Sequence, residues 1–501
     1  MPNRSAIRLV TVIEYFVYGC IWYGALGYSL YRAYTVTRDK WHTLYEYDLE
    51  DGWKVFEGRK KDIADFEWKF WTDALFTLPV FLGILGHIVI GWFSTTFLPQ
   101  YRQHLLLAYS LVSFYLVLGN LSFGFILANA IIMYTVSLLK MPSLCWITGL
   151  LQLVIVNHDP MKSWQSDLYE DEDEYYLMVF TLAMSYLRFL SFALEYCKLP
   201  SNGEHTHPGL FDYLVYIFYY PLFFCGPVMT FDTFYKQMNE VPTNLTKTEF
   251  IAICKNLLRV LFWTLFIEVG LHFVYFTAFH RNLYLFKYLP TWSLAGIGFT
   301  HVQFFHVKYV VMYGLPHTLA LFDHINSPKQ PACVAALYTF KDMWRYFDKG
   351  LHVWLMKYIY CPLGGSRHGL FYQLISSLSC FMYVAYWHGG ESHLYIWCLL
   401  NWLGVSMETL GNMFLDLKLV ENVRTQLPEC FVHRLKAVVM SPSFIMAVIS
   451  NLVFLGGNTL GSIYFNRIFQ DGWPNTTLWF VLVFYCQIML VSKLQTRWNY
   501  F

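Results

Sequence analysis

Long apolar runs, separated by short clusters of charge, constrain the fold of this chain more than any other feature. Only 14% of its 501 residues are charged, and 56% are hydrophobic. An ordinary soluble domain is about 25% charged, and it needs a charged surface to stay in solution. We therefore expect lipid to be the main solvent of this chain. The formal net charge of +1 gives no reason to expect a nucleic-acid partner.

The apolar runs have the length of membrane spans. A helix needs about 20 predominantly apolar residues to cross a bilayer. The 105–139 run contains no charge, and its Gly119-Asn120 step suits a tight turn between two helices. These runs predict an all-α, polytopic transmembrane helical bundle of about 11–12 passes, re-entrant loops included. The candidate spans are 9–31, 74–98, 105–139, 141–157, 177–197, 213–231, 257–279, 291–307, 309–322, 370–388, 393–411, 437–456 and 473–492.

Two segments depart from simple spans within the single membrane-embedded domain predicted for 1–501. Segment 38–73 includes KKDIADFEWKFW, whose mixture of charged and aromatic residues predicts an amphipathic helix on the membrane surface. Segment 213–235 contains Pro221, Gly226 and Pro227, which break a helix inside an apolar run. Broken backbone at that depth is tolerated only inside protein or beside a cavity. This predicts a re-entrant segment, with a simple proline kink as the alternative.

His388 follows a charge-free run, 371–387, and precedes Gly389 and Gly390. Two glycines after a helix suit a left-handed C-terminal cap and let a ligand approach the backbone. An ionisable side chain at membrane depth is costly and marks a functional site by default. The ordinary pKa of histidine, about 6.5, suits proton transfer near neutral pH. His388 is thus a candidate catalytic base, and a structural histidine bonded across helices is the alternative.

Residues 341–358, KDMWRYFDKGLHVWLMKY, have the pattern of one short amphipathic helix. Asp348 and His352 are four residues apart and would share a helix face, and Arg345 could pair with Asp348. The alternative is an interfacial helix whose charged face meets water. We predict that the catalytic region extends over 341–456.

Asn451 places a polar amide inside the predicted span 437–456. Such an amide can join two helices by a hydrogen bond, or it can donate to the carbonyl oxygen of a substrate. The residue alone does not distinguish these roles.

Several motifs in a fixed order resemble the membrane-bound O-acyltransferase family. The resemblance covers nearly the whole chain and extends to the subgroup that acylates hedgehog signals. The motifs are DFEWKFW (65–71), Tyr220-Pro221, Gly226-Pro227, Phe231 and Phe234, MWRYFD (343–348), WHG (387–389), LNWLGV (400–405) and SNLVFLGGN (450–458).

The resemblance implies roles for five residues. The invariant histidine of the family matches His388, and Asp348 stands where most members carry asparagine, as it does in the hedgehog subgroup. Trp344 matches a tryptophan at the acyl-CoA site. Asn451 matches the asparagine that contacts the acyl carbonyl. Cys333 matches a haem-ligating cysteine, so haem is the implied cofactor.

The implied activity is transfer of palmitate from palmitoyl-CoA to the N-terminal cysteine of a hedgehog N-terminal signalling domain. The product is an amide, and the implied location is the membrane of the endoplasmic reticulum or the Golgi. Asp348 could orient His388 or guide the incoming amine, and both remain open. One alternative is O-acylation of a lysophospholipid or sterol, against which Asp348 counts. Another is a non-enzymatic membrane transporter or scaffold.

Overall fold

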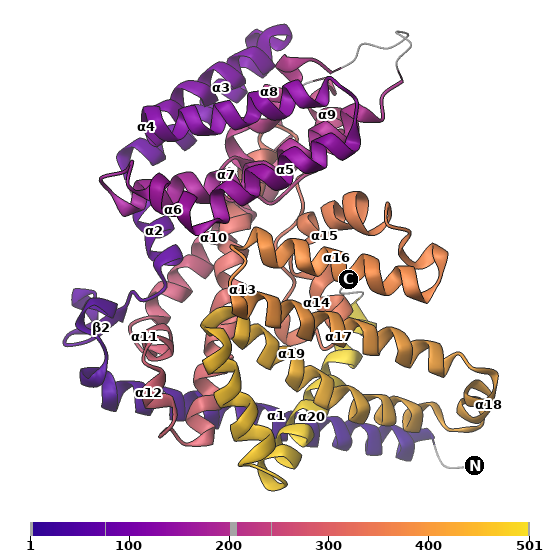
Figure 1. Ribbon diagram of the computed structural model, residues 1–501. Helices are drawn as coiled ribbons and strands as arrows, with labels where there is room; N and C mark the ends of the chain where they lie inside the picture. Colours follow the sequence, from indigo (N-terminus) through magenta and orange to yellow (C-terminus); the bar gives the residue numbers. More distant parts are fainter. Residues whose placement is uncertain (1–3, 76, 201–207, 242, 499–501) are drawn as a thin grey trace.

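The computed structural model describes residues 4–75, 77–200, 208–241 and 243–498. These residues form twenty α-helices, short 3₁₀ and π turns and one pair of three-residue strands. Helices α3 to α9 gather at the top of Figure 1, α14 to α20 lie below them towards the right, and α10 and α13 lie to the left of α14 to α16. The prediction of an all-α bundle is confirmed.

Helices follow one another along the chain, and the only strands among the described residues are β1 and β2. The elements are α1 (Arg4–Lys40), β1 (Leu49–Asp51), β2 (Lys60–Asp62), α2 (Phe66–Leu75), α3 (Leu78–Phe97), α4 (Arg102–Ser137), α5 (Pro142–Asn157), α6 (Asp159–Ser166), α7 (Glu172–Cys197), α8 (Leu210–Ile217), α9 (Phe231–Met238), α10 (Lys247–Gly270), α11 (Phe276–Arg281), α12 (Leu283–Phe286), α13 (Thr291–Leu321), α14 (Phe340–Tyr346), α15 (Lys349–Leu355), α16 (Leu370–Trp387), α17 (Ser392–Leu415), α18 (Lys418–Gln426), α19 (Glu429–Phe465) and α20 (Asn475–Trp498).

Six helices in the described part of the chain are long and apolar enough to cross a membrane. They are α3, α4, α7, α10, α19 and α20, in part with the short turns that flank them. A multi-pass membrane protein is therefore supported. The predicted spans 9–31, 141–157, 370–388 and 393–411 also form helices, within or matching α1, α5, α16 and α17. The number of passes beyond six stays a prediction.

At Gly119-Asn120, where a tight turn between two helices is predicted, the structure has a kink within one long helix, α4. Gly119 interrupts α4 with φ +71° and ψ 175°, so the run consists of two helical halves. Glycine suits this position because it has no Cβ to clash at positive φ.

Segment 213–235 is broken as its prolines predict. Helix α8 ends at Ile217, a 3₁₀ turn covers Tyr220–Leu222, and α9 begins at Phe231. The buried guanidinium of Arg188 donates to the carbonyl oxygens of Ile217, Leu222 and Phe223. These bonds replace helical ones, which is how broken backbone can stay inside the protein. Its re-entrant path in a membrane stays a prediction.

The helix predicted for KKDIADFEWKFW within 38–73 forms only from Phe66 onward, as α2, whereas Lys60–Asp62 is the strand β2; its place on a membrane surface stays a prediction. Between the end of α1 at Lys40 and residue 73 only α2 is α-helical, and β1 pairs with β2 as antiparallel strands. Asp62 explains the difference, because its buried carboxylate accepts bonds from the backbone N–H groups of Thr277 and Ala278 (2.9 and 3.2 Å). This contact ties the segment to α11 instead of leaving its polar face to water.

The predicted spans 291–307 and 309–322 are one helix, α13, of 31 residues. The prediction divided them at Lys308, because a lysine interrupts the apolar run. In the structure Lys308 is only 4% exposed and lies within bonding distance of two carboxylates, Asp65 and Glu67. The charge is therefore accommodated inside the fold, and the helix continues through it.

Candidate active site

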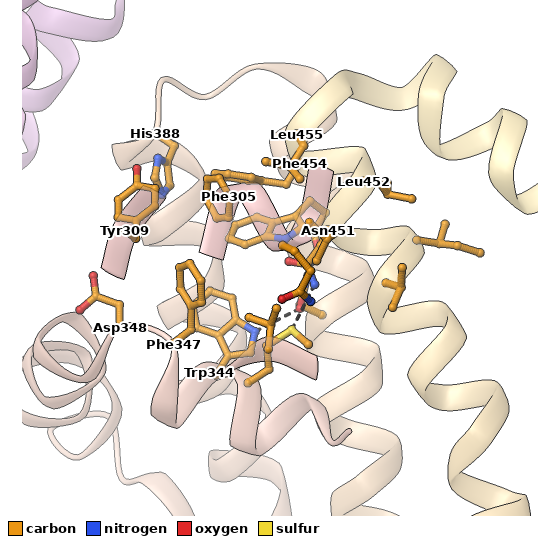
Figure 2. A pocket seen from close by; sticks show the side chains of 18 of the residues that line it. Phe305, Tyr309, Trp344, Phe347, Asp348, His388, Asn451, Leu452, Phe454 and Leu455 are labelled. Carbon is orange, nitrogen blue, oxygen red and sulfur yellow. Dashed lines mark hydrogen bonds between the residues drawn. The ribbon is translucent and has the colours of Figure 1, made fainter. Parts of the chain in front are cut away.

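A cavity of about 670 Å³ lies among α7, α13, α14, α15, α16, α17, α19 and α20. Ligand pockets commonly measure about 300–1,000 Å³. Four predicted site residues line this one cavity: His388, Asp348, Trp344 and Asn451. They come from four different elements, and Figure 2 shows them around the same space with several aromatic rings. Among these rings are Phe305, Tyr309, Phe347 and Phe454.

His388 caps the end of α16 as predicted. Its backbone N–H donates to Val384 (3.0 Å), and Gly389 and Gly390 have φ +118° and +70°. The imidazole is exposed to the cavity, with Phe454 packed edge-on at a centroid distance of 5.1 Å. Its nitrogens make no hydrogen bond to any described residue. This arrangement leaves the ring available to a ligand and gives no support to a histidine bonded across helices.

Asp348 interrupts the helix that the sequence predicts for 341–358. Helix α14 ends at Tyr346, and α15 begins at Lys349, with Asp348 as its N-cap residue at φ −118° and ψ 91°. The Asp348 carboxylate accepts a bond from the N–H of Leu351 (2.8 Å), which satisfies a donor that the helix start leaves unpaired. The prediction of a single helix is wrong. The periodicity of the sequence does not show that the Asp348 side chain caps the start of a second helix, α15.

The second oxygen of Asp348 accepts a bond from the hydroxyl of Tyr313 on α13 (2.9 Å). No hydrogen bond joins Asp348 to His388 or to Arg345 in the part of the chain that the structure describes. Asp348 is thus held by Tyr313 and by its own helix. Sequence reasoning missed Tyr313, whose only signal was a tyrosine in an apolar run.

Trp344 and Asn451 meet neighbouring side chains at the cavity wall. The indole N–H of Trp344 donates to Oδ1 of Asn401 on α17 (3.1 Å). The Asn451 amide donates to the carbonyl of Ala447 one turn back (2.9 Å) and to the sulfur of Met343 (3.1 Å). Sulfur is a weak acceptor, so a carbonyl oxygen could replace it. Dashed lines beside Trp344 and Asn451 mark hydrogen bonds near the centre of Figure 2.

A buried ionic cluster adjoins the cavity and contributes one residue, Glu67, to its wall. The Lys308 ammonium lies 3.0 Å from Asp65 Oδ2 and 2.7 Å from Glu67 Oε2. Glu67 lines the cavity and also accepts a bond from the hydroxyl of Tyr309 (3.4 Å). One cation facing two carboxylates gives the cluster a formal charge of −1. It fixes the start of α2 against α13.

Cys333 does not show a fit for haem. It is half-buried in the loop before the 3₁₀ turn Val334–Ala336, and it is not among the residues that line the cavity. The described residues contain no group of three or more His, Cys, Asp or Glu side chains that could hold a metal ion. The structure gives no support to haem at Cys333, and the chemistry proposed for the cavity does not involve it.

The chain is similar to known membrane acyltransferases. The sequence signature of MBOAT, the membrane-bound O-acyltransferase family, matches residues 67–450. Protein-cysteine N-palmitoyltransferase HHAT of Mus musculus is 36% identical over 469 residues, covering 91% of this chain and 93% of that protein. The HHAT-like protein of Mus musculus is 30% identical and covers 95% and 94%. Protein-cysteine N-palmitoyltransferase Rasp of Drosophila melanogaster is 26% identical and covers 99% and 98%.

Proposed function

Because the chain belongs to the membrane-bound O-acyltransferase family, and is therefore an acyltransferase, we propose that it palmitoylates hedgehog-type secreted signalling proteins. In this reaction palmitate passes from palmitoyl-CoA to the amine of an N-terminal cysteine. The names of two relatives, both protein-cysteine N-palmitoyltransferases, support a protein cysteine as the acceptor, and the ordered motifs support the hedgehog-type signal. The observation that carries the proposal is that His388, Asp348, Trp344 and Asn451 line one cavity.

The proposed chemistry is a direct acyl transfer. An α-amino group has an ordinary pKa of about 7.7–8.0, so a useful fraction is uncharged at neutral pH. Its nitrogen attacks the thioester carbonyl, the carbon–nitrogen bond forms, and the carbon–sulfur bond breaks. His388 takes the proton from the nitrogen as general base, and the thiolate of CoA leaves and is protonated. Asn451 donates to the carbonyl oxygen as negative charge develops on it.

Asp348 has a separate proposed role. Its carboxylate is already fixed by Tyr313 and Leu351, without a bond to His388. We therefore favour guidance of the cationic amine, together with long-range stabilisation of the imidazolium, over direct orientation of the histidine ring.

The proposed location is the membrane of the endoplasmic reticulum, or the Golgi. The acyl donor is made on the cytosolic side, whereas a secreted protein substrate lies in the lumen. Both substrates could reach a cavity among helices that opens to both faces of the membrane. The apolar outer surface of the protein would contact the surrounding lipid.

The proposal is tested by incubating the purified protein with labelled palmitoyl-CoA and three acceptors. These are a peptide that begins with cysteine, the same peptide with an acetylated N-terminus, and a lysophospholipid. We expect label only on the free-amine peptide, in a hydroxylamine-resistant amide. Label on the lipid alone would replace the proposal with O-acylation of lipids, and no label on any acceptor would favour a scaffold or transporter.

Asn451→Leu is expected to lower kcat for acyl transfer by about 10²–10³-fold, the usual cost of losing one such donor. The fold should persist, because the lost bonds are one within α19 and one to sulfur. The measurement is kcat with the cysteine peptide at saturating palmitoyl-CoA. As the control, Asn458→Leu changes an asparagine of the same helix that does not line the cavity, and it should retain kcat. An unaltered kcat in Asn451→Leu would exclude the donor role.

Asp348→Asn is expected to lower kcat/KM for the peptide by about one to three orders of magnitude, because a carboxylate close to the protonated amine strengthens its binding by that factor before His388 removes the proton. Asparagine caps helices about as well as aspartate, so the melting temperature of the protein should change little. The assay compares kcat/KM for the peptide with KM for palmitoyl-CoA, and only the former should change. A variant with wild-type kcat/KM would show that the charge is not used.

A further inference from the structure

Helix α14 carries Trp344, but it is too short to hold its own shape. It comprises seven residues, Phe340–Tyr346, whereas isolated helices below about 12–15 residues are marginal in water. Its own N-cap residue, Thr339, accepts one bond, from the N–H of Asp342 (3.0 Å). The remaining support must come from neighbouring helices.

One face of α17 provides that support. Asn401, Gly404 and Glu408 are spaced three and four residues apart, so they lie on one side of the helix. The Glu408 carboxylate accepts bonds from the backbone N–H groups of Phe340 (2.6 Å) and Lys341 (3.1 Å). These donors belong to the first turn of α14, where the helix itself has no acceptors for them. We call Asn401, Gly404 and Glu408 the α17 platform.

Gly404 lets the two helices approach closely. A methyl group at this position would lie 2.5 Å from ring carbons of Phe340, which is only 3% exposed. The absence of a side chain at Gly404 therefore makes room for the first residue of α14.

Asn401 connects the platform with the cavity. It is 2% exposed, and its Oδ1 accepts the indole N–H of Trp344 (3.1 Å). Its amide N–H₂ donates to Trp397 (2.8 Å) and lies 3.5 Å from the hydroxyl of Ser450, the neighbour of Asn451. One buried amide thus contacts the helix of Trp344 and the helix of Asn451.

We propose that Asn401 is a positioning residue for the acyl donor, acting through the hydrogen bond that fixes the Trp344 indole in the cavity wall, with Glu408 and Gly404 seating the helix that carries Trp344. This inference rests on the proposed acyl-CoA site at Trp344 and Asn451. It assigns a function to the LNWLGV motif, which the proposed chemistry leaves without one.

Asn401→Ala tests the proposal through KM. We expect KM for palmitoyl-CoA to rise about tenfold, a factor typical of leaving a buried donor without its partner. KM for the cysteine peptide should stay within about twofold, because bonding to Trp344 does not involve the amine. Asn412→Ala, at an exposed asparagine of the same helix, is the matched control and should behave as wild type.

Trp344→Phe removes the indole N–H and keeps an aromatic ring, so it should raise KM for palmitoyl-CoA to a similar degree. The double variant Asn401→Ala/Trp344→Phe should be no worse than either single one, because both remove the same bond. Effects that multiply, or a KM within twofold of wild type in Asn401→Ala, would overturn the proposal. If Asn401→Ala does not fold, Trp344→Phe alone decides, since an unchanged KM there would also overturn it.

The same variants are examined for binding of palmitoyl-CoA without peptide, by the rise in melting temperature on adding palmitoyl-CoA. Wild type should be stabilised, and Asn401→Ala should need about tenfold more palmitoyl-CoA for the same rise. If the wild-type protein binds palmitoyl-CoA but does not acylate the peptide, the proposed function is refuted. The binding comparison would still decide whether Asn401 positions the acyl donor. Equal binding by Asn401→Ala would refute the positioning role alone.

Discussion

His388→Ala is expected to lower kcat for acylation of the cysteine peptide by about 10²–10⁴-fold, the usual contribution of a positioned general base. The imidazole faces the cavity and bonds to no described residue, so its removal should leave the surrounding helices in place. Its backbone cap on α16 does not depend on the side chain. Acylation is measured with labelled palmitoyl-CoA, and the stabilisation of the protein by palmitoyl-CoA should persist.

His393→Ala is the matched control for this experiment. His393 lies five residues away at the start of α17, partly exposed and 3.4 Å from Glu391, and it does not line the cavity. It should retain kcat. A His388→Ala protein that folds and acylates at the wild-type rate would exclude His388 as the base, and an equal loss in both variants would indicate disturbance of the loop instead.

Lys308→Met is expected to destabilise the protein by about 3–5 kcal/mol, the cost of removing one partner from a buried ionic contact. The ammonium of Lys308 is 4% exposed, and its loss would leave Asp65 and Glu67 facing each other without a cation. The measurement is the apparent melting temperature of the protein in detergent. We expect a clear decrease relative to wild type.

Two further variants make this result specific. Lys69→Met removes a lysine that is 40% exposed and paired with Asp73 at 2.9 Å; exposed pairs contribute about 0.2–1 kcal/mol, so its melting temperature should hardly change. The triple variant Lys308→Met, Asp65→Asn, Glu67→Gln should recover much of the loss, because replacing all partners of a buried ion pair is often neutral. A wild-type melting temperature for Lys308→Met would contradict the ionic role of the cluster.

Local sequence signals predicted the backbone conformation correctly wherever it depends only on neighbouring residues. The two glycines after His388 predicted the left-handed cap, and Gly119 predicted the position of the kink in α4, because positive φ favours residues without a Cβ. Pro221 and Gly226 likewise predicted the interruption of 213–235. These features depend on residues next to one another, so periodicity and turn chemistry reveal them.

Features that depend on distant partners could not be predicted in this way. Lys308 looked like the boundary between two spans because Asp65 and Glu67, which neutralise it, lie more than 240 residues earlier. Asp348 looked like a residue within a helix, since nothing nearby shows that Tyr313 and its own cap would hold it. The ordered sequence motifs identified four residues that line the cavity. The contact of Asn401 with Trp344, in contrast, depends on how α17 packs on α14, which the motifs do not show.

The pairing of Lys308 also has a consequence for how the protein is made. During synthesis Asp65 and Glu67 leave the ribosome long before Lys308. Without them Lys308 would be a lone charge, which costs about 2.5–3.5 kcal/mol at the centre of a membrane helix. The carboxylates at the start of α2 are already present to receive it. We therefore expect the segment that contains Asp65 and Glu67 to pair with Lys308 while α13 inserts. The order of translation would then help α13 to insert with its lysine neutralised.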